Sequence, residues 1–349
     1  MSEPIPNWTA ICMQVLANVA SVSNSREEAR HMIATRLDHW QHLIAEMDAP
    51  LGRRLLLFPE FALTSSPQRE TTEAWIDKAC LAIPGPEIER VQKWASQYKT
   101  YIAMHAYTTI PTFPGRFFNS AILIDPAGDI LLISHRIHTG IAASPHDMLK
   151  EFLDKLGIDG LFPVAKTERG QIGMVNSTDL VWPEVPRALT LRGAEVLLHP
   201  TSETPANKVQ FDYVRRARAV ENMLYVVSCN IAGSAASPAT LTGKAAELPA
   251  VSRIFDLDGK VVAESPEGES TQCRGSINVA DVRRRRSDPK GLNFIAGLRV
   301  ETFRDIYDNT HIYPANTWTA ATKDFRSTSA RRNEMAIENM RKIGILPDA

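Results

Sequence analysis

The chain lacks the features that would place it among membrane or nucleic-acid-binding proteins. No stretch approaches the ~18 consecutive apolar residues that a membrane-spanning helix needs. Charge of neither sign is in excess, because 39 Lys and Arg residues stand against 40 Asp and Glu residues and leave a net charge of −1. A nucleic-acid binder normally needs a basic excess to neutralise phosphates, so we expect neither a nucleic-acid nor a membrane partner.

Cysteine is also scarce. The four that are present, Cys12, Cys80, Cys229 and Cys273, form no Cys-x-x-Cys pair, which argues against a disulfide framework and against a zinc site. The start of the chain, Met1-Ser-Glu-Pro-Ile-Pro6, has neither the basic nor the apolar part of a signal peptide. We therefore expect a cytoplasmic protein.

What remains is the composition of an ordinary globular protein, with 44% hydrophobic and 23% charged residues over 349 positions. Apolar residues recur in helical steps from Ile33 to Met47, which predicts a helix over 25–47. Further helices are predicted after Pro86 and at 145–156, 184–192 and 209–222. Strands are predicted at 8–17, 55–58, 101–107, 117–125, 130–134, 172–176, 196–199 and 224–230, and a late hairpin at 252–264. Helices between buried strands, mixed with hairpins, predict a layered α/β fold.

The first candidate site residue is Glu60, in the run Leu57-Phe-Pro-Glu-Phe-Ala-Leu-Thr64. A carboxylate directly after an apolar strand and a proline is held at the edge of a sheet, where active sites collect in open α/β folds. Partial burial there suits a carboxylate for general-base work. The alternative is a glutamate that caps a helix or forms a salt bridge.

The second candidate is Arg136, at the end of Asp125-Pro-Ala-Gly-Asp-Ile-Leu-Leu-Ile-Ser-His-Arg-Ile-His138. A hairpin strand delivers this cation, and a fixed cation near an acid can stabilise a developing oxyanion. The alternative is a structural arginine between two surface histidines, His135 and His138. Three positions apart on a strand, those histidines face opposite sides, so we expect no shared metal ion.

The third candidate is Ser177, in Ile172-Gly-Met-Val-Asn-Ser-Thr-Asp179, where a predicted strand runs into a sharp turn and then a helix. A nucleophile would sit in such a strand–turn–helix elbow. Backbone N–H groups of the turn, that of Thr178 among them, could bind an oxyanion there.

Together these motifs resemble the nitrilase superfamily, the carbon–nitrogen hydrolases. The resemblance runs from about residue 8 to about residue 316. It includes Phe118-Asn-Ser-Ala-Ile-Leu-Ile124, which contains Asn119, and Trp182-Pro-Glu184, which follows the elbow. It also includes the block Arg192-Gly-Ala-Glu-Val-Leu-Leu-His-Pro-Thr201 and the late Ser252-Arg-Ile-Phe-Asp-Leu-Asp-Gly-Lys-Val-Val-Ala263.

The resemblance implies a four-layer αββα sandwich that pairs into an αββα–αββα dimer, so a homo-oligomer is expected. We assign residues 1–300 to the nitrilase-like domain. Residues 301–349 form a C-terminal extension or arm that packs on the domain or on a partner subunit. The segment 139–161 is expected to be a substrate-facing lid, because long irregular loops carry specificity.

The resemblance also implies a Glu–Lys–Cys catalytic set that needs neither cofactor nor metal. In such a set the cysteine attacks a nitrile or amide carbon, the glutamate is the general base and the lysine steadies the tetrahedral intermediate. Glu60 matches the glutamate, but Arg136 stands at the lysine position and Ser177 at the cysteine position. Trp182 matches a residue that shapes the pocket wall. No second glutamate is in register, with Glu151 the nearest candidate.

Two functions follow from this altered site. The first is hydrolysis of a small amide or nitrile, with Ser177 as nucleophile, Glu60 as base, Arg136 as electrostatic clamp and the Thr178 amide as oxyanion donor. The second is a catalytically silent homologue that binds a small amide-like or carboxylate metabolite, or serves as a partner subunit. Ser177 is either natural or an engineered replacement of cysteine, and its coincidence with Arg136 favours a naturally diverged site. Substrate identity is not encoded in these motifs.

Overall fold

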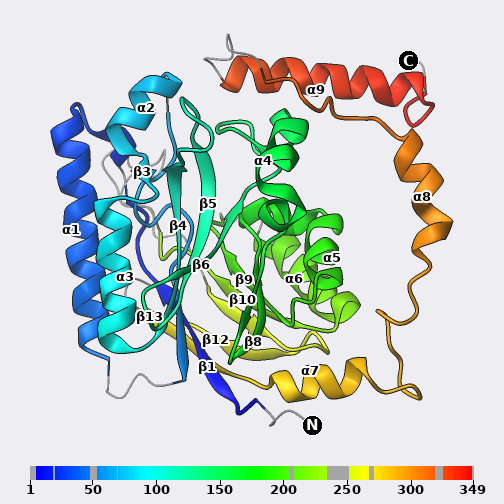
Figure 1. The fold of residues 1–349 in the computed structure, drawn as a ribbon, viewed down its shortest axis with the longest axis horizontal. Coiled ribbons are helices and arrows are strands. Elements are labelled where there is room, and N and C mark those ends of the chain that lie inside the picture. Colours follow the sequence, from blue (N-terminus) through cyan, green and yellow to red (C-terminus); the bar gives the residue numbers. More distant parts are fainter. Residues whose placement is uncertain are drawn as a thin grey trace.

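The computed structural model describes residues 5–18, 20–47, 53–68, 70–203, 208–233, 251–266, 271–318 and 325–347. Within them the chain forms two mixed sheets (Figure 1). The first has the order β13-β1-β2-β4-β5-β6, with β3 paired to β4, and the second has the order β12-β11-β10-β9-β8-β7. Strands of the first sheet are β1 (Trp8–Gln14), β2 (Arg54–Leu57), β3 (Leu81–Ala82), β4 (Tyr101–Thr109), β5 (Phe118–Ile124), β6 (Ile130–His135) and β13 (Thr271–Ile277). Those of the second are β7 (Val164–Thr167), β8 (Gly170–Met174), β9 (Val196–Pro200), β10 (Tyr225–Cys229), β11 (Arg253–Phe255) and β12 (Val261–Glu264).

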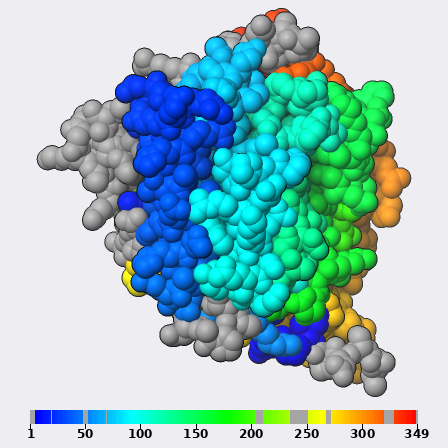
Figure 2. Space-filling model, turned by 60° about the vertical axis from the view of Figure 1, so that its left-hand side comes forward, coloured from blue at the N-terminus to red at the C-terminus, as the bar shows by residue number. Residues whose placement is uncertain are grey.

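Helices cover the outer face of each sheet, which gives the four layers. Against the first sheet lie α1 (Arg26–Ala45), α2 (Thr72–Ala79) and α3 (Pro86–Tyr98), and α1 and α3 run side by side on that surface (Figure 2). Against the second lie α5 (Glu184–Leu191) and α6 (Lys208–Asn222). A separate apolar core fills the space between the sheets and includes Trp8, Leu57, Ala121, Leu198 and Val227.

Parallel pairing sets which strand ends meet. The strands β1, β2 and β4 are mutually parallel neighbours in the first sheet, and β8, β9 and β10 are in the second. The carboxyl ends of β2 in the first sheet and of β9 in the second lie together, since Ser202 after β9 donates to Glu60 after β2 at 2.6 Å.

Most predicted elements are present, but the helix predicted over 145–156 is different. It begins as a 3₁₀ turn, Pro145–Met148, and continues as α4 (Leu149–Leu161). Ser144 and Asp147 form a capping box at its start, and Gly157 breaks the helical path with a φ of +63°. A reciprocal cap favours a tight first turn, and glycine adopts positive φ without a steric penalty.

The arginine run Arg283–Arg286 ties the end of α7 (Val279–Arg286) to the rest of the chain. Arg283 contacts Glu195 at 2.6 Å and Arg285 contacts Asp258 at 2.7 Å. Arg286 donates to the carbonyl oxygens of Ala194 and Asn222 at 2.8 and 2.9 Å. Because guanidinium groups offer several donors, they can satisfy exposed carbonyl groups at loop ends.

Two further helices follow α7 in the C-terminal part of the chain. They are α8 (Val300–Asn309), which buries none of its residues, and α9 (Phe325–Lys342). Figure 1 shows α8 beside the α5 side of the sandwich, where Tyr307 of α8 donates to Glu184 of α5 at 3.0 Å, and α9 crossing one end of the sandwich above α4. Part of the predicted extension, 319–324 and 348–349, lies outside the described residues.

Packing between α1 and the residue that follows β2 gives a stability prediction. Trp40 of α1 is fully buried and stacks on Phe58 with ring centroids 3.8 Å apart, two residues before Glu60. Trp40→Ala should lower the free energy of unfolding by about 3–5 kcal/mol because it leaves a cavity. Thr35→Ala, at an exposed position of the same helix, should change it by less than about 0.5 kcal/mol. Urea unfolding followed by circular dichroism measures both, and equal midpoints for the two variants would contradict the packing argument.

Candidate active site

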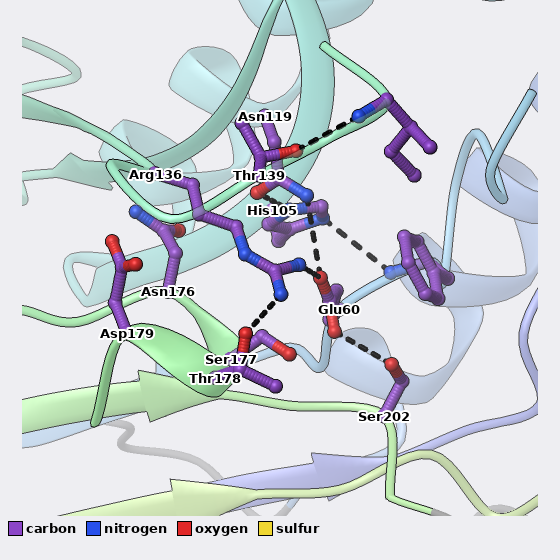
Figure 3. Close-up of polar contacts among 12 residues, drawn as sticks. Glu60, His105, Asn119, Arg136, Thr139, Asn176, Ser177, Thr178, Asp179 and Ser202 are labelled. Atoms are coloured by element: carbon purple, nitrogen blue, oxygen red, sulfur yellow. Dashed lines mark hydrogen bonds and ion pairs between the residues drawn. The ribbon is translucent and has the colours of Figure 1, made fainter. Parts of the chain in front are cut away.

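The structure brings the three sequence-predicted side chains to one place (Figure 3). Glu60 follows β2, Arg136 follows β6 and Ser177 follows β8. Arg136 Nη1 lies 3.1 Å from Glu60 Oε1. Its other terminal nitrogen, Nη2, donates to Thr178 Oγ1, in the turn that contains Ser177. The acid, the guanidinium and the serine turn therefore form one connected cluster across the two sheets.

Glu60 is fully buried, and both of its carboxylate oxygens are engaged. Oε1 accepts from Arg136 and from Asn119 Nδ2, the latter at 3.3 Å. Oε2 accepts from Ser202 Oγ at 2.6 Å. A buried carboxylate is tolerated only when it is paired and hydrogen-bonded, and these three donors meet that requirement.

Asn119 is oriented by His105. The amide oxygen of Asn119 lies 2.6 Å from His105 Nε2, and the Phe61 N–H donates to His105 Nδ1 at 3.4 Å. Nδ1 therefore accepts, and Nε2 carries the proton that goes to Asn119. Burial lowers the pKa of His105, which agrees with a neutral ring. His105 thus fixes the amide so that its NH₂ group faces Glu60.

All three nitrogens of the Arg136 guanidinium are in use. Besides Glu60 and Thr178, Nε donates to the carbonyl oxygen of His138 at 3.0 Å. The side chain is 13% exposed. A guanidinium with a fixed set of partners is a stationary positive charge, and it cannot release a proton as an ammonium group can.

Ser177 lies in a strained elbow. Its φ is +48°, in the left-handed region that L-residues rarely adopt, and it is buried. The turn is held by His199, whose Nε2 donates to the Ser177 carbonyl oxygen at 2.9 Å while Nδ1 accepts from Ser228 Oγ at 2.8 Å. Within the described part of the chain, no residue hydrogen-bonds the Ser177 hydroxyl. The turn thus has the shape of a nucleophile elbow, but among the described residues no base contacts the Ser177 hydroxyl.

Asp179 joins the serine turn to the arginine loop. Its buried carboxylate accepts from the backbone N–H groups of Ile137 and His138, at 2.7 and 2.8 Å, and contacts His138 Nδ1 at 2.9 Å. The His138 ring stacks flat on Trp182, with centroids 3.8 Å apart. Trp182 is 40% exposed, so it borders the site through His138 and does not touch Glu60 or Ser177 directly in the contacts described.

The two histidines that flank Arg136 differ from the surface pair considered as an alternative. His135 is buried and hydrogen-bonds Ser120 Oγ through Nδ1 at 2.9 Å, whereas His138 is part exposed. Glu151, the nearest candidate for a second glutamate, pairs with Arg116 at 2.7 Å and with Lys155 at 2.8 Å on α4. It takes no part in the cluster around Glu60.

His105 and Ser202 were not among the sequence-predicted site residues. Ser202 follows β9, so its position at the carboxyl end of a parallel strand was a usable signal. His105 lies inside the buried strand β4, where a single polar residue in an apolar run does not reveal its partner. All four cysteines are buried and unpaired, and Cys229 belongs to the core between the sheets. Among the described residues no group of His, Cys, Asp and Glu could hold a metal ion, and no helix could span a membrane.

The family model for carbon-nitrogen hydrolase matches residues 19–287, well over half of the chain. The chain belongs to the carbon–nitrogen hydrolase family. Among curated proteins it resembles formamidase from Bacillus cereus, with 28% identity over 184 residues, 52% of this chain and 51% of the relative. The chain thus aligns with about half the length of the curated relatives it matches.

Solved structures of the family share the fold. An amidase from Nesterenkonia sp. superposes with a TM-score of 0.61 at 17% identity, covering 88% of this chain and 98% of the amidase. Nit3 of Saccharomyces cerevisiae superposes with a TM-score of 0.56 at 17% identity, covering 82% and 96%. These likenesses establish an α/β fold of the nitrilase type with two mixed sheets.

The buried histidines next to the site predict an acid-sensitive fold. Burial lowers the pKa of His135 to about 4 and that of His199 to about 3. In the unfolded chain histidine titrates near 6.5, so below that pH the unfolded state binds more protons than the folded state. The contribution of the neutral histidines to the free energy of unfolding is fully present above about pH 6.5. Each of the two should lower the free energy of unfolding by about 2 kcal/mol between pH 7 and pH 5.

Urea unfolding at several pH values measures this dependence. His135→Gln should reduce its slope by about 1 kcal/mol per pH unit near pH 5, because one group no longer takes up a proton on unfolding. The exposed His31 of α1 provides the control, and His31→Gln should leave the slope unchanged. A parent protein equally stable at pH 7 and pH 5 would show the argument to be wrong.

Proposed function

We propose that this protein binds a small amide at the Glu60–Arg136–Ser177 site as a catalytically silent member of the carbon–nitrogen hydrolase family. The observation that carries the proposal is the state of the acid and the nucleophile position. Both oxygens of Glu60 are committed to Asn119, Arg136 and Ser202, and the Ser177 hydroxyl contacts none of them.

The chemistry of the substituted residues supports a lack of hydrolytic activity. A serine hydroxyl has a far higher pKa than a thiol and needs an aligned base to attack a carbonyl carbon. The printed partners of the Glu60 carboxylate are Asn119, Arg136 and Ser202, so it is not aligned with the Ser177 hydroxyl to take its proton. Arg136 cannot shuttle a proton in place of a lysine. Each substitution removes a step that amide hydrolysis needs.

The same groups remain suited to holding an amide. Glu60 can accept from an amide N–H, and the Arg136 guanidinium and the Thr178 N–H can face a carbonyl oxygen. The relatives' names fit this chemistry, since they are called formamidase and amidase. In one mutant of the Nesterenkonia amidase (TM-score 0.60, 16% identity, 87% and 98% covered), the acetamide moiety of fluoroacetamide is added covalently at an active-site cysteine. We expect ligands of similar size here.

One observation favours the hydrolase alternative. The strained elbow at Ser177, with a φ of +48°, is the geometry that presents a nucleophile beside backbone N–H groups. In this second candidate function Ser177 attacks the carbon of a small amide or nitrile, Glu60 takes the proton and the Thr178 N–H binds the oxyanion. Glu60 would first have to leave one of its present donors.

Restoring the family residues tests both functions. Ser177→Cys combined with Arg136→Lys should hydrolyse formamide or acetamide at least about 100-fold faster than the parent, because a lost nucleophile costs orders of magnitude. The parent and Ser177→Ala should be equally inactive in ammonia release. A parental rate that Ser177→Ala abolishes would overturn silence and establish the hydrolase. Calorimetry of the parent with acetamide tests whether the site binds a small amide. If acetamide, propionamide, butyramide and acetonitrile all fail to bind, the proposed binding site is refuted.

We further propose that two copies pair through the C-terminal arm. The helix α8, whose Tyr307 hydroxyl donates to Glu184 of the same chain at 3.0 Å, exposes Val300, Phe303 and Ile306 at 50–63%. A helix this short is marginal in water without a surface to pack on. The same chain exposes Leu191 on α5 and Tyr213 on α6, at 55% and 70%. A two-fold axis would place the arm of each copy on α5 and α6 of the other copy. This arrangement would bury the exposed apolar residues of both surfaces.

Charge placed on the arm tests this pairing. Phe303→Arg should convert the dimer into a monomer at micromolar concentration, because a buried unpaired charge costs several kcal/mol. Asp305→Arg, on the opposite face of α8, should leave the dimer intact. Sedimentation equilibrium measures the mass, and a parent that is monomeric or a Phe303→Arg variant that remains dimeric would contradict the proposal.

A further inference from the structure

Helix α9 carries a buried arginine that is far along the chain from the site. Arg332 is 3% exposed, and its Nη1 lies 2.9 Å from Oδ2 of Asp147, which is 2% exposed. Its neighbour Arg331 is exposed. A fully buried ion pair between a C-terminal helix and the segment after Arg136 is costly to desolvate, so it marks a contact with a specific geometry.

The contact is not limited to one pair of charges. The chain that leads to α9 lies along the same segment, with the N–H of Trp318 donating to the Asp147 carbonyl oxygen at 2.8 Å and that of Asn316 to the His146 carbonyl oxygen at 3.1 Å. On α9 itself, Ser329 packs so closely on Gly140 that a Cβ added there would lie 2.4 Å from Ser329 Oγ. The 316–318 segment and α9 therefore both contact the 140–147 segment.

From Asp147 a series of hydrogen bonds leads to the site. Asp147 forms the capping box with Ser144, and Ser144 Oγ donates to the Ile137 carbonyl oxygen at 2.5 Å. The N–H of Ile137 donates to Asp179, beside the serine turn, and the next residue, His138, accepts from Arg136 Nε. Every link is a contact between neighbouring groups, and Arg136 is the last residue in the series.

We propose that Arg332 is a positioning residue, and that α9 holds the Arg136 loop in place through the Arg332–Asp147 ion pair. The inference deepens the proposed function, because it concerns the orientation of the guanidinium that faces the ligand. Arg332 does not touch Glu60 or Ser177 in the described contacts and acts through the 137–147 segment alone.

An introduced thiol can report on this positioning without any catalytic turnover. In Ser177→Cys the thiolate attacks the methylene carbon of iodoacetamide, an S–C bond forms and iodide leaves. The four native cysteines are buried, so the parent chain gives the blank. The rate constant at saturation and the half-saturating concentration are measured separately by intact mass.

In that background Arg332→Gln should lower the saturating rate constant about tenfold, because a displaced guanidinium no longer orients the amide of the reagent. Arg331→Gln is the matched control and should change nothing. Arg332→Lys keeps the charge and should recover at least half of the loss. Asp147→Asn should reproduce the effect of Arg332→Gln, and the double variant should add little to either, because the two residues act as one pair.

Hydrogen exchange on the full chain provides a second, independent measurement. Arg332→Gln should speed exchange of the Ile137 and His138 amides, and Arg331→Gln should not. The proposal is overturned if Arg332→Gln and Arg331→Gln label alike, or if faster exchange is confined to α9. If Arg332→Gln does not fold, the neutral double variant Asp147→Asn with Arg332→Gln replaces it, and normal labelling of that variant also overturns the proposal. Labelling that never saturates in any variant counts against the amide site, while the exchange data still decide the role of Arg332.

Discussion

The ion pair between Glu60 and Arg136 is the interaction on which the site depends. It joins the end of β2 to the end of β6, and the same guanidinium reaches across to the turn after β8. Removing one partner of a buried pair typically costs about 3–5 kcal/mol, because the remaining charge is left without compensation. Neither residue can therefore be replaced alone without a loss of stability at the meeting point of the sheets. A lysine at 136 would offer one compact charge, whereas the planar fork serves three partners at once.

Around this pair, neutral groups are arranged to fix direction. His105 and His199 are both buried. His105 donates its ring N–H to the amide oxygen of Asn119, and His199 donates its ring N–H to the carbonyl oxygen of Ser177. Because burial lowers the pKa of both rings, they stay uncharged and act as rigid hydrogen-bonding spacers. The carboxylate of Glu60 is thereby paired with the Arg136 guanidinium, and that of Asp179 with backbone N–H groups and His138. Such a cluster fits the retention of a polar ligand better than the generation of a nucleophile.

The sequence was sufficient to single out Glu60, Arg136 and Ser177, because each follows an apolar strand; β2 and β6 lie in one sheet and β8 in the other, and their ends meet where the two sheets face each other. It was not sufficient for their contacts. That Arg136 pairs with Glu60 depends on side-chain directions that a strand pattern does not encode. His105 was missed because its partner, Asn119, lies on the neighbouring strand β5. Only the pairing of β4 with β5 brings the two side chains together.

The fold shows the same division. Long amphipathic helices such as α1 and α3 were predicted closely, since their apolar stripes span several turns. The short helix α2 and the strand β13 were not predicted. α2 has only eight residues, and β13 gains its place by pairing with β1 from the other end of the chain. The arginine run at the end of α7 has carbonyl and carboxylate groups of distant segments as partners, and the charge pattern of the sequence does not reveal them.

The contact of α9 with Asp147 also bears on how the chain is made. A ribosome releases β1 through α7, and with them Glu60, Arg136 and Ser177, before it releases Arg332. During that interval the sandwich can fold around its three apolar cores, while the Asp147 carboxylate has no ion-pair partner from Arg332. The Arg332–Asp147 contact beside the Arg136 loop can therefore form only after the strands that carry Glu60, Arg136 and Ser177 have been released.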